Sequence, residues 1–388
     1  MDFNELLTAE KEYLIELRRE FHKNPEKSWH EYQTSRRIKE ELDKIGVKYQ
    51  SFAGTGVVAV IEGAEEGKTV ALRADMDALE LDEETELSFK SENEGLMHAC
   101  GHDGHTAMLL TAARALVKVK DKLSGKIKLI FQPAEEMVAG AKEMVKEGAL
   151  EDVEAVLGIH LWSGLKTGII NVEAGPRMAS GDYVMIDFIG AGGHGSLPQQ
   201  TVDPIAAASA FVMESQAVMS RESSPLDPVV FTIGKIDSGS RFNIIPSQAA
   251  LEGTLRCFSE ESRTAASEAI KRFAKKTASA YRAEAEVEIK EGTPPTVNDP
   301  QIVEYAQRAA RQIVGDENLV SMQKTTGSED MAYYLREVPG CMAFVGAGFE
   351  DQSKNFPHHH PEFNLNEESL LIGASLYFNF ALNFLNND

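Results

Sequence analysis

The chain has 388 residues, of which 43 % are hydrophobic, and its 39 Lys and Arg residues against 61 Asp and Glu residues give a formal net charge of −22. A field of this sign repels nucleic acid, so we expect no nucleic-acid partner. The length exceeds that at which one hydrophobic core usually stops growing, which predicts two domains.

Three further features concern the cellular compartment. No stretch of the sequence is as long and as uniformly apolar as a membrane span, and the first residues have the pattern of a charged amphipathic helix rather than of a signal peptide. The 3 cysteines are scattered and do not resemble a disulfide framework. We therefore expect a soluble, cytoplasmic protein with no membrane partner.

The first part of the chain reads as an α/β domain. Residues 4–23 and 31–45 have helical patterns. Short apolar runs with β-branched residues then alternate with helical segments at 104–120 and 138–149, and these runs are GVVAVIEG, TVALRADMDAL, KIKLIFQPAEE and EAVLGIHLW. The alternation predicts a sheet that is covered by helices on both faces.

The pattern changes near residue 178. Strand-like and helical segments follow in the order β-α-β-β-α-β, which is typical of a ferredoxin-like domain, until the strand-like CMAFVGAG and a closing helix return to the α/β pattern. We predict a discontinuous domain of residues 1–177 and 291–388, into which a smaller domain of residues 178–290 is inserted.

Several predicted strands of the larger domain lead to side chains that can bind a metal. Asp75 follows TVALR, Glu135 and Glu136 follow KIKLIF, His160 follows AVLGI, and CMAFVGAG leads on to the histidines 358–360. Because the functional crevice of an open α/β sheet lies beyond the carboxyl ends of its strands, we expect these side chains to lie together.

The stretch MHACGHDGHT, residues 97–106, adds three histidines and a cysteine. Its glycines disfavour a helix, so we interpret it as a turn in which Cys100 and His102 point the same way and Asp103 caps the next helix. Thiolate, imidazole and carboxylate ligands suit zinc, manganese, iron or cobalt, and they do not suit magnesium or calcium. The ligand set is too large for one closed site, which favours two metal ions that share a ligand.

The doublet Glu135-Glu136 indicates a hydrolytic mechanism. Hydrolysis at a metal needs one carboxylate that holds the ion and a second carboxylate that takes a proton from water. Adjacent residues can point apart and divide these two roles, although the spacing alone does not assign them.

Two other patterns lie in the predicted inserted domain. Residues 190–195, GAGGHG, match the G-x-G-x-x-G pattern of dinucleotide-binding proteins, but Pro198 follows closely and no first-strand βαβ unit opens the chain. We interpret the segment as a flexible loop that presents His194. Arg241 and Asn243 are local donors for a substrate carboxylate, which the overall negative charge would otherwise repel.

Taken together, these motifs resemble the aminoacylase/carboxypeptidase metallohydrolase family. Within the family they are most similar to the amidohydrolase branch of hippurate hydrolases, auxin-conjugate hydrolases and N-acetyl-amino-acid deacetylases. The resemblance rests on HACGHDGHT, FQPAEE, GIHLW, GGHGS, NIIPSQAALEGTLR, TGSEDMAYY and HHHPEF, in the family's order from about residue 73 to 363. It implies an α/β metallohydrolase domain with a central mixed sheet, plus an inserted ferredoxin-like lid and dimerisation domain.

The resemblance also implies residue roles. Glu135 would be the general base, and Asp75 would support the metal ligands without binding metal. Arg73 stands where other branches use a histidine ligand. The H-x-P-x-F pattern selects His359 from the three consecutive histidines. Two divalent ions, manganese or zinc with cobalt or nickel as alternatives, would have as ligands Cys100, His102, Glu136, His160 and His359.

The inserted domain would act between subunits. The resemblance implies that His194 reaches the partner subunit's site and stabilises the oxyanion there, while Asn243 binds the substrate's carboxylate or the oxyanion. Arg241 is a further candidate for substrate binding. We expect a homodimer or a dimer of dimers through this domain.

The expected function is metal-dependent hydrolysis of the amide bond of an N-acyl amino acid, with an N-acetyl, N-benzoyl or similar acyl group. The first alternative is a dipeptidase or carboxypeptidase that uses the same site. A non-catalytic metal-binding protein is disfavoured by the presence of both Glu135 and Glu136. A nicotinamide-dependent oxidoreductase would have to use GAGGHG.

Overall fold

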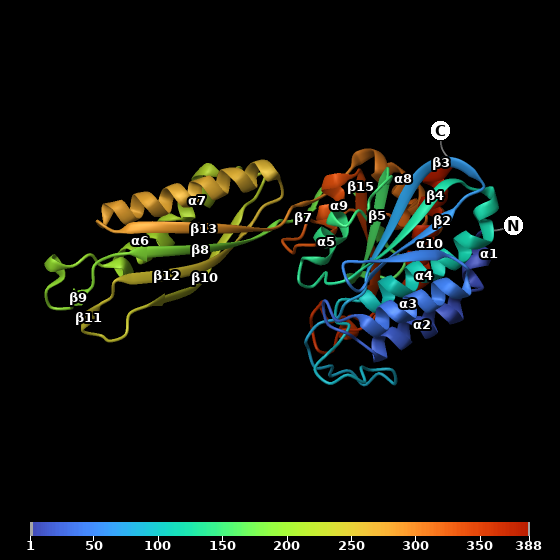
Figure 1. The fold of residues 1–388 in the computed structure, drawn as a ribbon, viewed down its shortest axis with the longest axis horizontal. Helices are drawn as coiled ribbons and strands as arrows, with labels where there is room; N and C mark the ends of the chain where they lie inside the picture. Colours follow the sequence, from blue (N-terminus) through green and yellow to red (C-terminus); the bar gives the residue numbers. More distant parts are fainter. Residues whose placement is uncertain (1–2, 387–388) are drawn as a thin grey trace. The chain divides into compact units, whose positions relative to one another are not determined.

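The computed structural model describes residues 3–386, which form two compact units (Figure 1). The larger unit contains the residues up to Gly175, residues 297–323 and the residues from Asp330 onward, and the smaller unit contains residues 176–296 and 324–329.

The segment 324–329 differs from the predicted domain boundaries, because it packs with the smaller unit. Thr325 donates its N–H to the carbonyl of Arg177 at 3.0 Å, and Gly327 accepts the N–H of Ala179 at 3.0 Å. These backbone bonds join two segments that are far apart in the sequence, so no local pattern reveals them.

The larger unit is built on a mixed sheet. Among the described residues this sheet has seven strands in the order β1-β2-β4-β3-β5-β15-β6, with β3 parallel to β4 and β5, and β15 parallel to β5. The other neighbours are antiparallel. The strands are β1 (Lys48–Phe52), β2 (Gly56–Glu62), β3 (Glu65–Asp75), β4 (Ser124–Gln132), β5 (Ala155–Lys166), β6 (Ile170–Asn171) and β15 (Gly340–Gly348).

Helices cover both faces of this sheet. On one face, alternate strand residues such as Leu72, Leu129 and Leu157 belong to a large apolar core with α4, α8 and α10. On the other face, α5 and α9 contact the strands. The helices of this unit are α1 (Phe3–Thr8), α2 (Lys11–Lys23), α3 (Tyr32–Lys44), α4 (His102–Val119), α5 (Gly140–Lys146), α8 (Pro300–Val314), α9 (Met331–Glu337) and α10 (Glu368–Leu385), with short 3₁₀ turns at Lys120–Lys122, Asp316–Asn318 and Gln352–Lys354.

Helix α10 is, within residues 3–386, the one helix long and apolar enough to cross a membrane by length and composition. In the structure 67 % of it is buried, and it packs against α4 and α8. This burial is that of a core helix, because its apolar side chains already contact protein on most sides.

Two details of the predicted helices are wrong. The segment predicted as one helix over 4–23 is divided into α1 and α2 at Ala9 and Glu10. The Glu10 carboxylate there accepts hydrogen bonds from Arg114 at 2.8 Å and Lys118 at 2.5 Å, both on α4. A tertiary contact that the local pattern cannot show therefore accompanies this break in the helix.

The start of α4 also differs from the prediction, since Asp103 is not its cap. Gly101 precedes the helix with φ +87°, a backbone conformation that favours glycine, and the helix begins at His102. Asp103 lies in the first turn, where its buried carboxylate accepts hydrogen bonds from Arg18 and His22, each at 2.8 Å. The carboxylate is used to anchor α2 rather than to cap α4.

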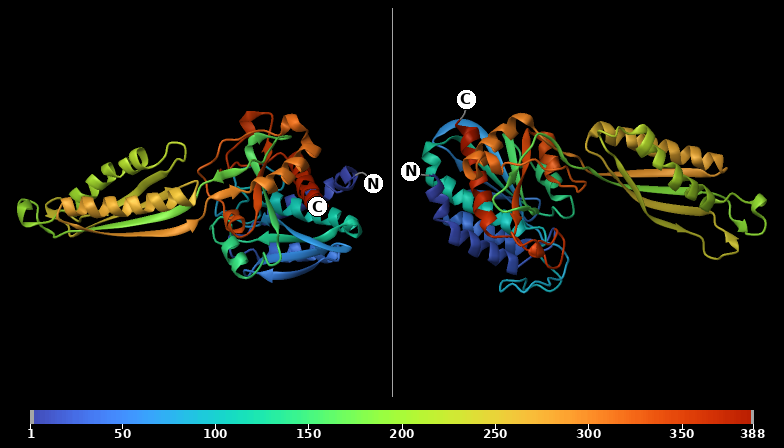
Figure 2. Two further views of the ribbon diagram at one scale, coloured as in Figure 1. Left: turned by 90° about the horizontal axis from the view of Figure 1, so that it is seen from above. Right: turned by 180° about the vertical axis from the view of Figure 1, so that it is seen from behind.

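The smaller unit has the predicted ferredoxin-like order. Its antiparallel sheet is arranged as β10-β12-β8-β13, and α6 and α7 pack on one face through a core that includes Phe188, Phe211 and Ile270 (Figure 2). The elements are β8 (Gly181–Ile189), α6 (Pro204–Glu214), a π-helix (Val218–Glu222), β10 (Val230–Ser238), β12 (Gln248–Arg256), α7 (Glu260–Ala280) and β13 (Glu284–Thr293).

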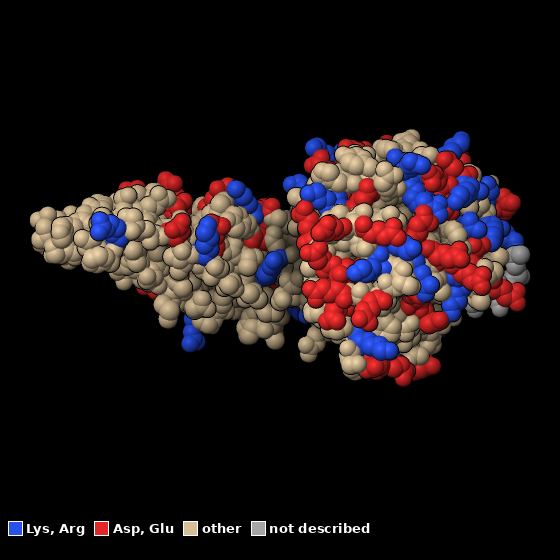
Figure 3. All heavy atoms as spheres, turned by 90° about the horizontal axis from the view of Figure 1, so that it is seen from below, with Lys and Arg blue, Asp and Glu red and all other residues tan. Residues whose placement is uncertain are grey.

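Shorter elements complete the fold. β9 (Gly193–His194) pairs with β11 (Ile244–Ile245), a 3₁₀ turn lies at Pro198–Gln200, and β7 (Gly175–Met178) pairs with β14 (Thr296–Asn298). On the face shown in Figure 3, acidic side chains gather over the larger unit, whereas the smaller unit presents mainly uncharged side chains.

Candidate metal centre

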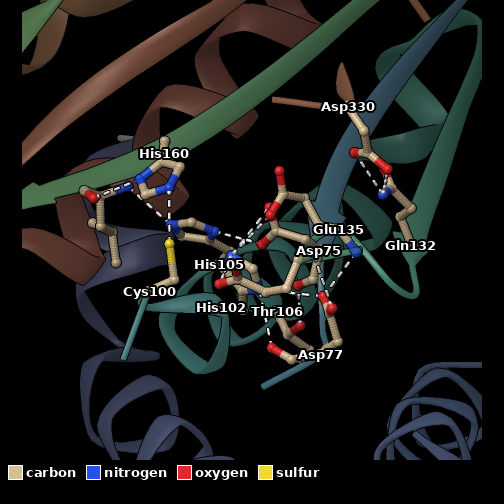
Figure 4. A network of polar contacts seen from close by, with 12 residues as sticks. Asp75, Asp77, Cys100, His102, His105, Thr106, Gln132, Glu135, His160 and Asp330 are labelled. Atoms are coloured by element: carbon tan, nitrogen blue, oxygen red, sulfur yellow. Dashed lines mark hydrogen bonds and ion pairs between the residues drawn. The ribbon is translucent and has the colours of Figure 1, made fainter. Parts of the chain in front are cut away.

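The predicted ligands of the larger unit converge at the carboxyl ends of its parallel strands, as the sequence predicts, and Figure 4 shows Cys100, His102 and His160 among them. Asp75 ends β3, the loop after β4 carries Glu135 and Glu136, His160 lies in β5, and Cys100 and His102 lie at the start of α4. The sheet therefore sets the positions of these side chains, since each is on or next to an element with a buried backbone.

Two groups of three donor residues overlap at one cysteine. Ligand atoms of Cys100, His102 and His160 all lie within 4.8 Å of one another, and so do those of Cys100, Glu136 and His359. The structure thus brings together all five predicted ligands. An arrangement of this kind offers three protein donors to each of two ions and lets one thiolate serve both.

The hydrogen bonds of two histidines fix which nitrogen is available to a metal. The His160 Nδ1–H donates to the carbonyl of Leu161 at 2.7 Å, and the His102 Nδ1–H donates to the carbonyl of Asp77 at 3.0 Å. A carbonyl oxygen can only accept, so each ring carries its proton on Nδ1 and presents the lone pair of Nε2. Nε2 of His160 lies 3.5 Å from Sγ of Cys100.

Two of the predicted ligand residues each have a buried side-chain atom that lacks a hydrogen-bond partner among the described residues, and this fits a metal ion. These atoms are Nε2 of His102 and Oε1 of Glu136. A buried polar atom without a partner is costly, so native structures rarely keep one unless a ligand or water satisfies it. The residues present therefore fit the metal ions that the ligand pattern implies.

The electrostatics of this centre favour a cation. Burial by itself lowers the pKa of His102, but the carboxylates of Asp75, Asp77 and Glu136 outweigh burial and raise that pKa to about 10. A buried site that keeps an imidazole protonated in this way carries excess negative charge. A divalent ion would replace that proton when it binds.

The three consecutive histidines have different surroundings, which separates their roles. His358 donates from Nε2 to the carbonyl of Leu161 at 3.0 Å, so this nitrogen is already used. His360 stacks on Phe356 with ring centroids 4.7 Å apart. Neither ring belongs to a donor group with Cys100.

The middle histidine is the one directed to the centre. Nε2 of His359 lies 3.4 Å from Oε2 of Glu136. Its backbone has φ +66°, which is unusual for a residue with a side chain, and its N–H donates to the carbonyl of Ala99 at 2.9 Å. Strained backbone that neighbouring bonds hold in place is common at functional sites.

Glu135 is placed beside these groups rather than within them. Its Oε2 lies 4.0 Å from Nε2 of His102, and the side chain is almost fully buried. Glu135 belongs to neither donor group that contains Cys100, although its ligand atom lies within 4.8 Å of those of His102 and Glu136. This position is suited to proton transfer next to a metal.

His105 and Asp75 form a supporting pair. The ligand atoms of His105 also lie close to those of Asp75 and His102, but both of its ring nitrogens are used. Leu161 N–H donates to Nε2 at 2.9 Å, so Nδ1 carries the proton and donates to Asp75 at 2.6 Å. His105 therefore orders the backbone beside His160 and is a poor candidate for a ligand.

Arg73 stands where other branches of the family use a histidine ligand, and it has a structural role here. Its buried guanidinium donates to Asp75 at 2.8 Å, to Gln132 at 2.8 Å and to Asp330 at 2.9 Å. Asp330 also accepts the N–H of Ala141, the second residue of α5, at 2.9 Å. This network joins the ends of β3 and β4 to α5 and α9.

A family model described as peptidase family M20/M25/M40 matches residues 71–383. The chain belongs to this family. It is 40 % identical over 380 residues to thermostable carboxypeptidase 1 of Saccharolobus solfataricus, covering 97 % of this chain and 96 % of that protein. It is 37 % identical over 384 residues to N-acetyl-L-cysteine deacetylase of Bacillus subtilis, covering 99 % and 90 %.

A solved structure of the same family is also similar. The Bacillus subtilis YXEP protein, described as a dinuclear metal binding peptidase from the M20 family, superimposes with a TM-score of 0.87 at 34 % identity, covering 98 % of this chain and 100 % of that one. This M20 chain is a metal-binding hydrolase of the amidohydrolase type, and its α/β fold with a large mixed sheet is the M20 fold.

The remaining predicted residues of this M20 chain lie in the smaller unit. His194 is in β9 and pairs with Ile244 of β11, and its Nδ1 accepts the N–H of Ser196 at 3.1 Å. Asn243 and Arg241 precede β11 and are exposed, and the carbonyl of Asn243 accepts the N–H of Gly195 at 2.9 Å. The structure brings these three residues to one end of the smaller unit, and their roles in catalysis stay predictions.

The sequence does not single out two buried carboxylates next to the centre, Asp77 and Glu31. Asp77 lies in the DMD segment after β3, where its neighbour Asp75 is the more visible signal. Glu31 lies before the segment that the M20 model matches, and its sequence context shows only the start of a helix. Both accept backbone hydrogen bonds from the loop that carries Glu135.

Proposed function

We propose that this M20 hydrolase cleaves the amide bond of N-acyl amino acids at a centre of two divalent metal ions. The observation that carries the proposal is the pair of donor groups that share Cys100, with Glu135 beside them and outside both. Such an arrangement separates the residues that hold metal from the residue that moves a proton.

Bound metal ions would supply Lewis acidity, which would polarise the scissile carbonyl and lower the pKa of a water molecule. Glu135 accepts the proton of that water and returns it to the leaving amine. Glu136 would hold a metal ion and would take no part in the proton transfer. The lone pairs of His102 and His160 are oriented by the carbonyls of Asp77 and Leu161.

The roles of the smaller unit are part of the same proposal. His194 would stabilise the oxyanion in the partner subunit's site, and Asn243 and Arg241 would bind the substrate carboxylate, because that charge needs local donors in an acidic protein. Manganese or zinc is the proposed metal, in a cytoplasmic enzyme.

The similarity to an N-acetyl-L-cysteine deacetylase favours an N-acyl amino acid as substrate, while the similarity to a thermostable carboxypeptidase favours the alternative of a peptide substrate. We would measure kcat/KM for N-acetyl and N-benzoyl amino acids and for dipeptides of the same C-terminal residue. At least tenfold higher values for the N-acyl substrates are expected. Higher values for the dipeptides would establish the alternative.

We also propose a homodimer or a dimer of dimers through the smaller unit. The support is the number of apolar side chains exposed there, such as Phe242 at 97 % and Leu226 at 90 % exposure. Sedimentation equilibrium of the full chain should give at least twice the mass of one chain. A monomer at micromolar concentration would contradict both the dimer and the action of His194 between subunits.

A further inference from the structure

Three consecutive backbone N–H groups in the loop after β4 point at buried carboxylates. Ala134 N–H donates to Oε1 of Glu31 at 2.9 Å. The N–H groups of Glu135 and Glu136 donate to Oδ1 and Oδ2 of Asp77, each at 3.1 Å. The two amides on Asp77 therefore belong to the proposed base and to the proposed metal ligand.

The backbone of this loop is bent in a way that exposes its amides. Ala134 has φ +51°, although it is not a glycine. Successive N–H groups around such a residue form a concave site for an anion. The Asp77 carboxylate occupies part of that site, and charge-assisted hydrogen bonds of this kind are stronger than bonds between neutral groups.

Asp77 also contacts a third functional residue. His102 donates from Nδ1 to the carbonyl of Asp77 at 3.0 Å, and the same nitrogen lies 3.4 Å from Oδ1. The remaining partner of the carboxylate is the hydroxyl of Ser28, which donates to Oδ2 at 2.6 Å. Asp77 is fully buried, so these contacts are shielded from water.

We propose that Asp77 is a positioning residue that sets the relative placement of Glu135, Glu136 and His102 by binding all three at once. The Asp77 carboxylate holds the backbone of the proton acceptor and of one metal ligand, and the Asp77 main-chain carbonyl holds the other metal ligand, His102. The part of this inference that concerns Glu135 rests on the proposed hydrolysis, and the part that concerns Glu136 and His102 needs metal binding alone.

A general need for a buried hydrogen-bond acceptor would not explain this arrangement. Glu31 is equally buried, and it accepts the N–H of Ala134, the N–H of Trp29 at 2.9 Å and the hydroxyl of Thr55 at 2.7 Å. Among these partners none is a proposed ligand or base. Glu31 is therefore a matched control that supports the same loop without touching the functional residues.

Because Asp77 and Glu31 have different hydrogen-bond partners, replacing each carboxylate with an amide should have different effects. In Asp77→Asn, both original oxygens face a backbone N–H, so either orientation of the amide places an NH₂ group against a donor. In Glu31→Gln, the NH₂ group can face Thr55, whose hydroxyl can turn and accept. Ser28→Ala removes a bond to Asp77 and leaves both backbone amides paired.

The experiment measures the affinity for Mn²⁺ by calorimetry, kcat and KM at saturating Mn²⁺, and the melting temperature, for the wild type and the three variants as full-length chains. Asp77→Asn should weaken Mn²⁺ binding and lower kcat by about 10- to 100-fold each, with KM changed less than about threefold. Glu31→Gln and Ser28→Ala should stay within about threefold of the wild type in all three constants.

Wild-type Mn²⁺ affinity in Asp77→Asn would overturn the proposal. It would also fail if the three variants lost affinity and kcat in parallel with their melting temperatures, because that pattern is expected of a purely structural role. If the wild type binds Mn²⁺ and cleaves no N-acyl amino acid, the proposed function fails, while the binding measurements still decide whether Asp77 positions the ligands.

Discussion

Sγ of Cys100 lies 3.5 Å from Nε2 of His160, and the same cysteine also belongs to the donor group of Glu136 and His359. A thiolate shared by the two proposed metal ions would account for the position of this cysteine at the end of the turn before α4. A ligand of both ions and a ligand of one ion should differ in how much metal the protein loses when each is replaced.

The shared cysteine should affect both metal ions. Because a serine hydroxyl is a much weaker ligand than a thiolate, Cys100→Ser should reduce the metal content well below that of the wild type. His359→Ala should instead lose about one ion per chain. Elemental analysis after dialysis distinguishes the two, and Cys341→Ala, which changes a core strand residue, is the control. Equal metal content in Cys100→Ser and the wild type would show that Cys100 is not a ligand.

The adjacent glutamates should separate metal binding from turnover. Glu135→Gln should keep its metal content and lose about 10²- to 10⁴-fold in kcat, since a positioned base contributes that much. Glu136→Gln should lose metal as well as activity. Metal content and kcat are measured on the same preparations. A loss of metal in Glu135→Gln that matches the loss in Glu136→Gln would reassign Glu135 as a ligand.

His105 should be needed for stability rather than for metal binding. His105→Ala removes the partner of Oδ1 of Asp75 and of the Leu161 N–H, while Arg73 still donates to Oδ2 of Asp75, and each lost partner costs about 1 to 3 kcal/mol. We expect a lower free energy of unfolding in urea for the metal-free protein, with the number of ions per chain unchanged. A variant that folds and binds fewer ions would make His105 a ligand.

A pH dependence follows from Glu10. Burial raises its pKa, but hydrogen bonds from Lys118 and Arg114 outweigh burial and lower it below the ordinary value. A carboxylate with a lowered pKa stabilises the fold above its unfolded pKa of about 4.3, and this contribution is lost as the pH falls below that value. Glu10→Gln should therefore cost about 1 to 3 kcal/mol at pH 7, and the difference from the wild type should shrink below about pH 4.3.

The matched control for Glu10 is Glu40, which forms an ion pair with Arg36 at 2.9 Å on the exposed surface. Glu40→Gln should change the free energy of unfolding by less than about 0.5 kcal/mol at any of these pH values. Urea denaturation at pH 7 and at pH 4 measures both variants. A pH-independent effect of Glu10→Gln would mean that its packing, and not its charge, stabilises the junction of α1 and α2.

The sequence could locate the residues whose side-chain type is unusual for the kind of segment in which they lie. A cysteine and histidines in a glycine-rich turn, or a pair of acids after a buried strand, mark a site by residue type and spacing alone. The rule that parallel strands end at one edge then predicts that Cys100, His160 and Glu136 meet. The strand and helix order likewise predicts the ferredoxin-like unit.

The residues that the sequence could not locate act through tertiary contacts. Asp77, Glu31 and Asp103 are ordinary acids in the sequence, and only the fold shows that their carboxylates accept hydrogen bonds from distant segments. The division of the first helix at Glu10 and the packing of 324–329 with the smaller unit have the same origin. Local patterns carry no information about partners that lie far away along the chain.

This chain is proposed to be an amidohydrolase with two metal ions. The most direct measurement is the metal content per chain, together with the rate of N-acetyl-amino-acid hydrolysis before chelation, after chelation and after the return of Mn²⁺ or Zn²⁺. About two ions per chain and activity that is lost and restored with them are expected. A chain that holds no metal under these conditions, with no activity gained when Mn²⁺ or Zn²⁺ is added, would contradict the account.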